Sequence, residues 1–228
     1  MYALGPAEWQ AIDVTLRLCL YTTIILLVLA TPLAWWLAKG RSRGRNVVQA
    51  IVSLPLVLPP TVLGFYLLVA MGPRGIVGKT LQDLGFHHLA FSFEGILIAS
   101  ILYSMPFAVQ PLTEAFSNLG RRPVEVASSL GAGALDRFRT VIFPLTRSGF
   151  VVAATLTFAH TMGEFGVILM LGGSIPGETK VLSVLIYDHV EAMNYEAAHS
   201  LSLLLLIFAF TTLFVVYSLT RRFQVVRV

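Results

Sequence analysis

The chain has 228 residues, of which 56% are hydrophobic and only 12% are charged. Soluble globular domains are roughly 45–50% apolar and about 25% charged, so this composition excludes an ordinary soluble protein. The net charge of +4 does not indicate a nucleic-acid partner, because the 16 Lys and Arg residues lie mostly in short clusters between long apolar runs. The lone Cys19 excludes an intrachain disulfide and a cysteine metal cluster. The composition therefore predicts a protein embedded in a lipid membrane.

Five apolar stretches are each long enough, at about 20 residues, to cross the roughly 30 Å hydrocarbon layer as a helix. In chain order they cover residues 18–38, 50–71, 93–113, 149–171 and 198–220. The first stretch is not predicted to be a cleavable signal, because Glu8 and Asp13 precede it and no basic segment does. The sequence thus predicts an all-α integral membrane protein with five transmembrane helices, and residues 1–228 are expected to form one membrane domain.

The distribution of Lys and Arg predicts the orientation of these helices. Twelve basic residues fall on one side of the predicted topology: Lys39, Arg41, Arg43, Arg45, Arg121, Arg122, Arg137, Arg139, Arg147, Arg221, Arg222 and Arg227. Four fall on the other side: Arg17, Arg74, Lys79 and Lys180. Loops rich in Lys and Arg face the cytoplasm. We therefore expect the N-terminus outside, the C-terminus in the cytoplasm and a cytoplasmic loop at 114–148.

The second predicted span is unusually rich in prolines and hydroxyls. It contains Ser53, Pro55, Pro59, Pro60 and Thr61. A proline removes a backbone donor and leaves a carbonyl free, which lipid cannot satisfy. These residues are therefore candidates for lining a transport path or a gate, although ordinary kinking of a packed helix is an equal alternative.

The cytoplasmic segment 114–148 contains a short predicted helix with clear start and stop signals. Pro123 suits the first helical turn, and Glu125 just after it complements the helix dipole. Gly131 supplies the left-handed residue that ends the helix. A helix of about nine residues is not stable alone in water. We therefore expect it to dock into a groove of a partner protein.

Glu164 is the only acidic residue well inside a predicted span. Carboxylates inside membranes are costly and are functional candidates by default. The neighbouring Gly163 and Gly166 predict a local break in the helix, where Glu164 accepts hydrogen bonds from freed backbone N–H groups. We expect these three residues to shape a gate or pin the helix; a direct part in transport chemistry is the alternative.

The spacing of residues in the cytoplasmic segment resembles the EAA motif of ABC importer permeases. That motif reads Glu-Ala-Ala, three residues, Gly, nine residues, then Ile-x-Leu-Pro. The matching residues here are Glu125, Val126, Ala127, Gly131, Val141, Phe143 and Pro144. Val126, Val141 and Phe143 are conservative departures. The resemblance implies a type I ABC importer permease fold, in which this segment forms the coupling helix that inserts into a cytoplasmic ATPase.

Other stretches resemble the molybdate branch of this family. They are Glu8-Trp9-Gln10, residues 54–60 followed by Gly64, Gly163-Glu164-Phe165-Gly166, and Ile175-Pro176-Gly177-Glu178-Thr179. The resemblance implies a permease that carries molybdate. Tungstate and sulfate are the alternatives, since tungstate is nearly isosteric with molybdate and sulfate permeases share the Gly-Glu-Phe-Gly stretch.

The resemblance also implies partners. It implies a second copy of the chain, two cytoplasmic ABC ATPase subunits that hold ATP and Mg, and an external oxyanion-binding protein, in the cytoplasmic (inner) membrane of a prokaryote. The chain itself is expected to bind no cofactor or metal and to have no enzyme activity. Gly78-Lys79-Thr80 is not a phosphate-binding loop, because Pro73 occupies the place of the first glycine of that motif.

Two functions from other classes are weaker alternatives. A membrane-embedded enzyme needs convergent polar residues, and the spans offer only His160 and Glu164 on one helix face, without a nucleophile or metal set. A secondary carrier predicts inverted repeats, of which the sequence gives no sign.

Overall fold

The computed structural model describes residues 4–40 and 42–224, with side chains through residue 218. Every element in these residues is helical; η1 is a 3₁₀ helix and η2 is a π-helix. In chain order the elements are α1 (Pro6–Ala38), α2 (Arg43–Ser53), η1 (Leu54–Leu56), α3 (Pro60–Met71), α4 (Ile76–Asp83), α5 (Phe93–Leu119), α6 (Arg122–Ser129), α7 (Ala134–Arg137), η2 (Phe138–Ile142), α8 (Phe143–Met162), α9 (Gly166–Gly172), α10 (Leu182–Glu191) and α11 (Tyr195–Gln224).

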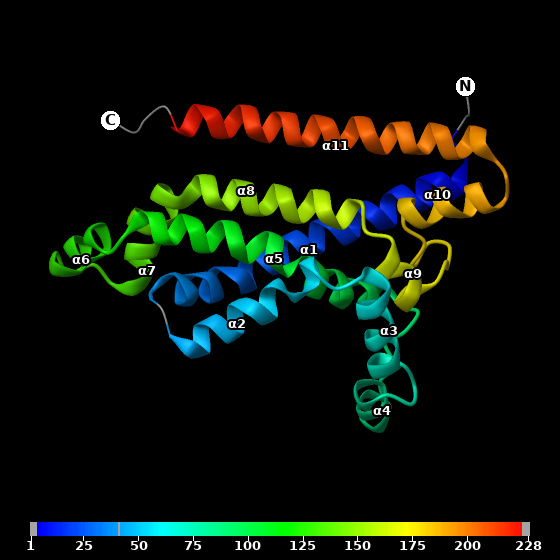
Figure 1. Cartoon of the computed structure of the whole chain (residues 1–228), viewed down its shortest axis with the longest axis horizontal. Coiled ribbons are helices and arrows are strands. Elements are labelled where there is room, and N and C mark those ends of the chain that lie inside the picture. The colour runs from blue at the N-terminus through cyan, green and yellow to red at the C-terminus, as the bar shows by residue number, and fades with distance from the viewer. Residues whose placement is uncertain (1–3, 41, 225–228) are drawn as a thin grey trace.

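The long helices α1, α5, α8 and α11 run along the long axis of the molecule, with α6 and α7 at one end and α9 and α10 at the other (Figure 1). The α3–α4 arm projects sideways near the α9 end. The loops predicted to be cytoplasmic are grouped at the α6 end, as that topology requires. Which end faces the cytoplasm stays a prediction. Of the basic residues on which it rests, Arg41, Arg227 and the side chains of Arg221 and Arg222 lie outside the described part of the chain.

Five stretches of the described chain are long and apolar enough to cross a membrane, which confirms the predicted number. They are Pro6–Ala38, Pro60–Asp83, Phe93–Leu119, Ala134–Met162 and Tyr195–Ser218. The first begins well before the predicted residue 18, because Glu8 is buried and accepts a hydrogen bond from Gly5 N, and Asp13 pairs with Arg17 one turn later. Charged side chains with such partners do not end a helix.

The predicted span 50–71 is wrong as a single helix. α2 ends at Ser53, and residues 57–59 between η1 and α3 are not helical. The reason is the Pro59–Pro60 pair: a proline disfavours helical geometry in the residue before it, and each proline lacks the N–H of a helical hydrogen bond. Pro60 instead begins α3, where a proline is tolerated. The apolar stretch long enough to span runs from there to Asp83.

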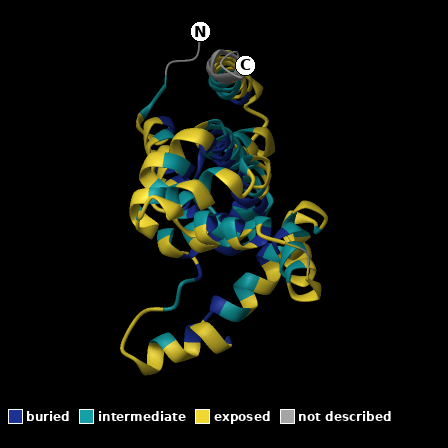
Figure 2. Ribbon diagram, turned by 90° about the vertical axis from the view of Figure 1, so that its left-hand side faces the viewer, coloured by how far each residue is buried: buried dark blue, intermediate teal, exposed yellow. Residues whose placement is uncertain are grey.

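The core lies where α1, α5 and α8 cross. Ala34, Ala108 and Ala153 are fully buried in one apolar cluster contributed by these helices. Gly149 on α8 lies so close to α5 that a Cβ there would be 2.3 Å from the Cβ of Ala115. Small residues allow this close approach between membrane helices. Figure 2 shows buried residues gathered inside the bundle, while the outer faces of the helices are exposed.

Candidate functional site

α6 is an exposed helix at one end of the molecule. Pro123 lies in its first turn, none of its residues is buried, and Leu130 just after it is 83% exposed. Gly131 has φ +84°, and Gly131 N and Ala132 N donate to carbonyls of the last turn. A left-handed glycine ends a helix in this way, so the predicted start and stop signals are confirmed. Glu125 is exposed on this helix.

The second half of the motif lies at a different place from the first. Val141 is in the π-helix η2, and Phe143 and Pro144 begin α8. Ile142 between them is buried in the cluster of α1, α5 and α8, and the Phe143 ring packs 5.1 Å from that of Phe150. This half therefore anchors the loop to the helix bundle. The first half, with α6, projects from it.

The fourth predicted span is broken after Met162, and α9 starts at Gly166. The break predicted from Gly163 and Gly166 is thus present. α9 packs against α3: a Cβ on Gly166 would lie 2.9 Å from Pro60 Cβ, and a Cβ on Gly64 would lie 2.7 Å from Met170 Cβ. The two interrupted spans therefore meet at their breaks.

The structure brings together only part of the predicted pathway set. Pro60, Thr61 and Gly166 lie at the α3–α9 contact, since the backbone N of Thr61 is also close to Gly166. Ser53 instead faces α5, where its Oγ accepts a hydrogen bond from Gln110 at 3.3 Å. Pro55 is in η1, and Pro59 is exposed in the linker before α3.

Glu164 is buried in the break between α8 and α9, with 3% of its surface exposed. Its carboxylate accepts a hydrogen bond from Ser100 Oγ and lies 3.4 Å from Ser104 Oγ, both on α5. Its carbonyl oxygen accepts a hydrogen bond from Ser183 Oγ. The expectation that freed backbone N–H groups satisfy the carboxylate is wrong, because hydroxyl groups of α5 do so.

His160 belongs to the same buried cluster. Its Nδ1 lies 2.9 Å from Ser104 Oγ and 3.8 Å from a Glu164 oxygen, and its ring stacks on Phe107 at 4.0 Å. The Ser104 hydroxyl also lies 3.0 Å from that of Thr161. His160 and Thr161 on α8 thus contact Ser104 on α5 across the two helices. Within the described chain, no group of three or more His, Cys, Asp and Glu side chains could hold a metal.

Residues 30–225 match the family model described as "Binding-protein-dependent transport system inner membrane component". The chain belongs to this family. A relative from Azotobacter vinelandii, named Molybdenum transport system permease protein ModB, is 56% identical over 97% of each chain. A relative from Helicosporidium sp. subsp. Simulium jonesii, named Probable sulfate transport system permease protein cysT, is 34% identical over 92% of this chain and 78% of its own.

The permease also shares its fold with a solved transporter. The crystal structure of a bacterial ABC transporter involved in the import of alginate has a chain that superposes with a TM-score of 0.77 at 19% identity, over 96% of this chain and 80% of that chain. The fold is thus that of an ABC importer permease, and the chain is a multi-pass inner membrane component. Family membership also makes its transport dependent on a binding protein.

Sequence reasoning missed Ser100 and Ser104, the two residues that hold Glu164. A signal was present, since they are one helical turn apart and therefore on one face of a mostly apolar predicted span. Paired hydroxyls in a membrane helix indicate contact with a polar group of a neighbouring helix. The single sequence did not say which group that was.

Proposed function

We propose that this chain is the membrane-spanning subunit of an ABC importer that carries molybdate inward across the inner membrane. The observation that carries the proposal is the 56% identity, over 97% of each chain, to a permease named for molybdenum transport. The relative named for sulfate transport is only 34% identical. Tungstate is nearly isosteric with molybdate, so we expect the permease to pass it as well.

Coupling to ATP hydrolysis is proposed to occur through α6. The helix projects from the bundle and offers apolar side chains to a partner: Val126 is 60% exposed and Leu135, in the following helix, is 62% exposed. Such side chains fit a groove in another protein. We propose that two cytoplasmic ATPase subunits bind ATP and Mg and receive this helix, with Glu125, Val126, Ala127 and Gly131 at the contact. When the ATPase moves α6, the anchored residues Val141, Phe143 and Pro144 would transmit that displacement to α8.

A second copy of the chain is proposed to complete the path. α3 and α4 leave the bundle, and their apolar side chains lack cover: Ile76 is 86% exposed, and Phe65 and Tyr66 are also exposed. Val47 and Ile51 on α2 are exposed as well. One side of the α3–α4 arm can face lipid. The broken segment before α3, however, has carbonyls without helical partners, and these need protein neighbours inside a membrane. A symmetric second copy of the chain would supply those neighbours.

The binding protein is proposed to dock at the end of the molecule that carries α4 and α10. Both elements lie there, together with the exposed residues Leu84, Phe86 and Met193. In the described chain this end has few basic side chains, and its Lys180 is paired with Asp188 at 2.8 Å. The basic side chains at this end would therefore not retain the anion that the binding protein releases.

The test is ATP hydrolysis by the permease reconstituted with its ATPase and binding protein in proteoliposomes. We expect molybdate and tungstate to stimulate hydrolysis over the rate without anion, and sulfate to do so far less. Stimulation by sulfate alone would assign the permease to sulfate. A stimulation independent of any oxyanion would refute the proposal.

A further inference from the structure

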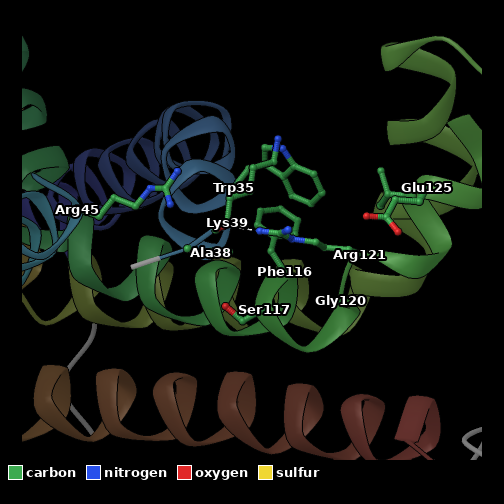
Figure 3. A pocket seen from close by; sticks show the side chains of 11 residues that line it. Trp35, Ala38, Lys39, Arg45, Phe116, Ser117, Gly120, Arg121 and Glu125 are labelled. Carbon is green, nitrogen blue, oxygen red and sulfur yellow. Dashed lines mark hydrogen bonds between the residues drawn. The ribbon is translucent and has the colours of Figure 1, made fainter. Parts of the chain in front are cut away.

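A cavity of about 730 Å³ opens at the α6 end of the permease, apart from the α3–α9 contact and the Glu164 cluster (Figure 3). The ends of α1 and α5 and the starts of α2 and α6 enclose it. The side chains that determine its chemistry are Trp35, Lys39, Arg45, Phe116, Arg121 and Glu125. The proposed transport path does not use this cavity, and the proposed ATPase contact on α6 shares only Glu125 with it.

Three cations line the cavity, and among the described residues none of them has a carboxylate at ion-pair distance. Arg121 donates one hydrogen bond, from Nη2 to the carbonyl oxygen of Lys39 at 3.3 Å. The Lys39 ammonium lies 4.7 Å from the centre of the Trp35 ring. Glu125 points toward Arg121 in Figure 3 but does not pair with it. Three cations and one carboxylate leave the cavity positive.

The cations are positioned before any ligand arrives. The Arg45 guanidinium lies over the Trp36 ring at 5.2 Å, and it passes so close to Gly40 that a Cβ there would be 2.7 Å from Nη1. Aromatic faces fix cationic side chains through their quadrupole. A guanidinium held in this way keeps most of its N–H donors for an anion, and its planar fork matches phosphate oxygens.

We propose that this cavity binds the phosphate group of an anionic phospholipid. The aromatic walls Trp35 and Phe116 suit the glycerol and first acyl carbons, and tryptophan is enriched at the membrane–water interface. The exposed Trp36 ring on α1, over which Arg45 lies, suits an acyl chain. Basic pockets between membrane helices bind acidic headgroups. A free phosphate ion shares the headgroup chemistry but makes no use of this apolar surface.

The test is native mass spectrometry of the full-length permease from nanodiscs of equal phosphatidylglycerol and phosphatidylcholine, alone and assembled with its ATPase. We expect selective retention of phosphatidylglycerol in both states. Arg45→Gln and Arg121→Gln should each weaken it about fivefold, the effect of one cation near a membrane surface. Arg43→Gln is the matched control, since Arg43 lies on the same helix as Arg45 but is exposed and outside the cavity. It should leave retention unchanged.

Several results would overturn the proposal. Equal retention of both lipids would show that the cavity does not select the anionic headgroup. An equal loss of phosphatidylglycerol from Arg43→Gln and Arg45→Gln would show only nonspecific attraction of the lipid to basic residues at this end. Loss of the lipid on ATPase assembly would assign the cavity to a protein contact. If millimolar inorganic phosphate displaces the lipid and is itself retained, the cavity is a site for free phosphate. Arg45→Lys keeps the charge but loses the planar fork, so it should weaken retention less than Arg45→Gln does. An equal loss in both Arg45 variants at unchanged thermal stability therefore also counts against lipid recognition by charge.

Discussion

Ser100 on α5 donates a hydrogen bond to the carboxylate of Glu164, in the non-helical stretch that joins α8 to α9. The bond connects residues 64 positions apart. Because Ser183 at the start of α10 also bonds the Glu164 carbonyl, the break is held from two sides. The break places α9 against α3, so we expect Glu164 to act on the proposed path by positioning a helix rather than by touching the anion.

Substitution of Glu164 tests this positioning role. Glu164→Gln keeps an acceptor for the serine hydroxyls, so we expect a modest loss of thermal stability and partial molybdate uptake. Glu164→Leu leaves the buried Ser100 hydroxyl without its partner, at a cost of about 1–3 kcal/mol, while Ser104 keeps its contacts with His160 and Thr161. We expect a midpoint of unfolding several degrees lower and little uptake. The measurements are thermal unfolding in detergent and uptake at matched membrane abundance.

Serine variants supply the control for that experiment. Ser100→Ala should lower stability, while Ser117→Ala on the same helix should not, because Ser117 is exposed and bonds only its own helix. If Gln and Leu at position 164 are equally inactive while both proteins remain stable, the charge of Glu164 takes part in transport and the positioning role is wrong.

Gly64 tests the contact between the two interrupted spans. Alanine is usually favoured over glycine inside a helix by about 1 kcal/mol. At Gly64, however, a Cβ would lie 2.7 Å from Met170 Cβ and 3.2 Å from the Val167 backbone. We expect Gly64→Ala to destabilise the permease by about 1–3 kcal/mol through overpacking. Thermal unfolding in detergent measures this.

The matched control is Gly44→Ala, also inside a helix, where a Cβ would have nothing within 4 Å. It should be neutral or stabilising. If both substitutions raise the unfolding midpoint equally, α3 and α9 do not pack closely at Gly64.

Cysteine labelling tests the orientation derived from the basic residues. Asp136 and Glu178 are both exposed, at opposite ends of the molecule. With the buried Cys19 replaced by alanine, Glu178→Cys should react with an impermeant maleimide in intact cells. Asp136→Cys should react only after the membrane is opened. The reverse pattern would place α6 outside the cell, where no ATPase could reach it.

Apolar length and helix signals predicted most of the fold. α5 and α11 coincide with predicted spans, and α6 begins and ends where Pro123 and Gly131 indicate. These features depend on residues near each other in the chain. The prediction of span 50–71 as one helix was wrong because the Pro59–Pro60 pair does more than kink the helix: it interrupts it.

Contacts between distant segments were beyond a single sequence. The break at Gly163 was predictable from its own residues, but the serines that satisfy Glu164 belong to another helix, and several hydroxyls in the spans could have served equally well. The packing of Gly64 against α9 likewise depends on how two broken helices are placed in space.

The contact between α6 and the ATPase is tested most directly by Gly131→Trp. Gly131 has φ +84° and open space around it, so a tryptophan there strains the turn and adds bulk to the proposed contact without disturbing the bundle. Gly85→Trp is the matched control, with φ +83°, equally open space and a place at the opposite end of the chain's fold.

The measurement is co-purification of the ATPase for both variants at matched membrane abundance, with oxyanion-stimulated hydrolysis measured for Gly131→Trp. Hydrolysis is not compared for Gly85→Trp, because Gly85 lies beside the proposed binding-protein surface. Gly131→Trp should lose ATPase binding and molybdate-stimulated hydrolysis at least tenfold, while Gly85→Trp keeps its ATPase. Normal binding and hydrolysis by Gly131→Trp would contradict the assignment of this chain as an ATPase-coupled permease through α6.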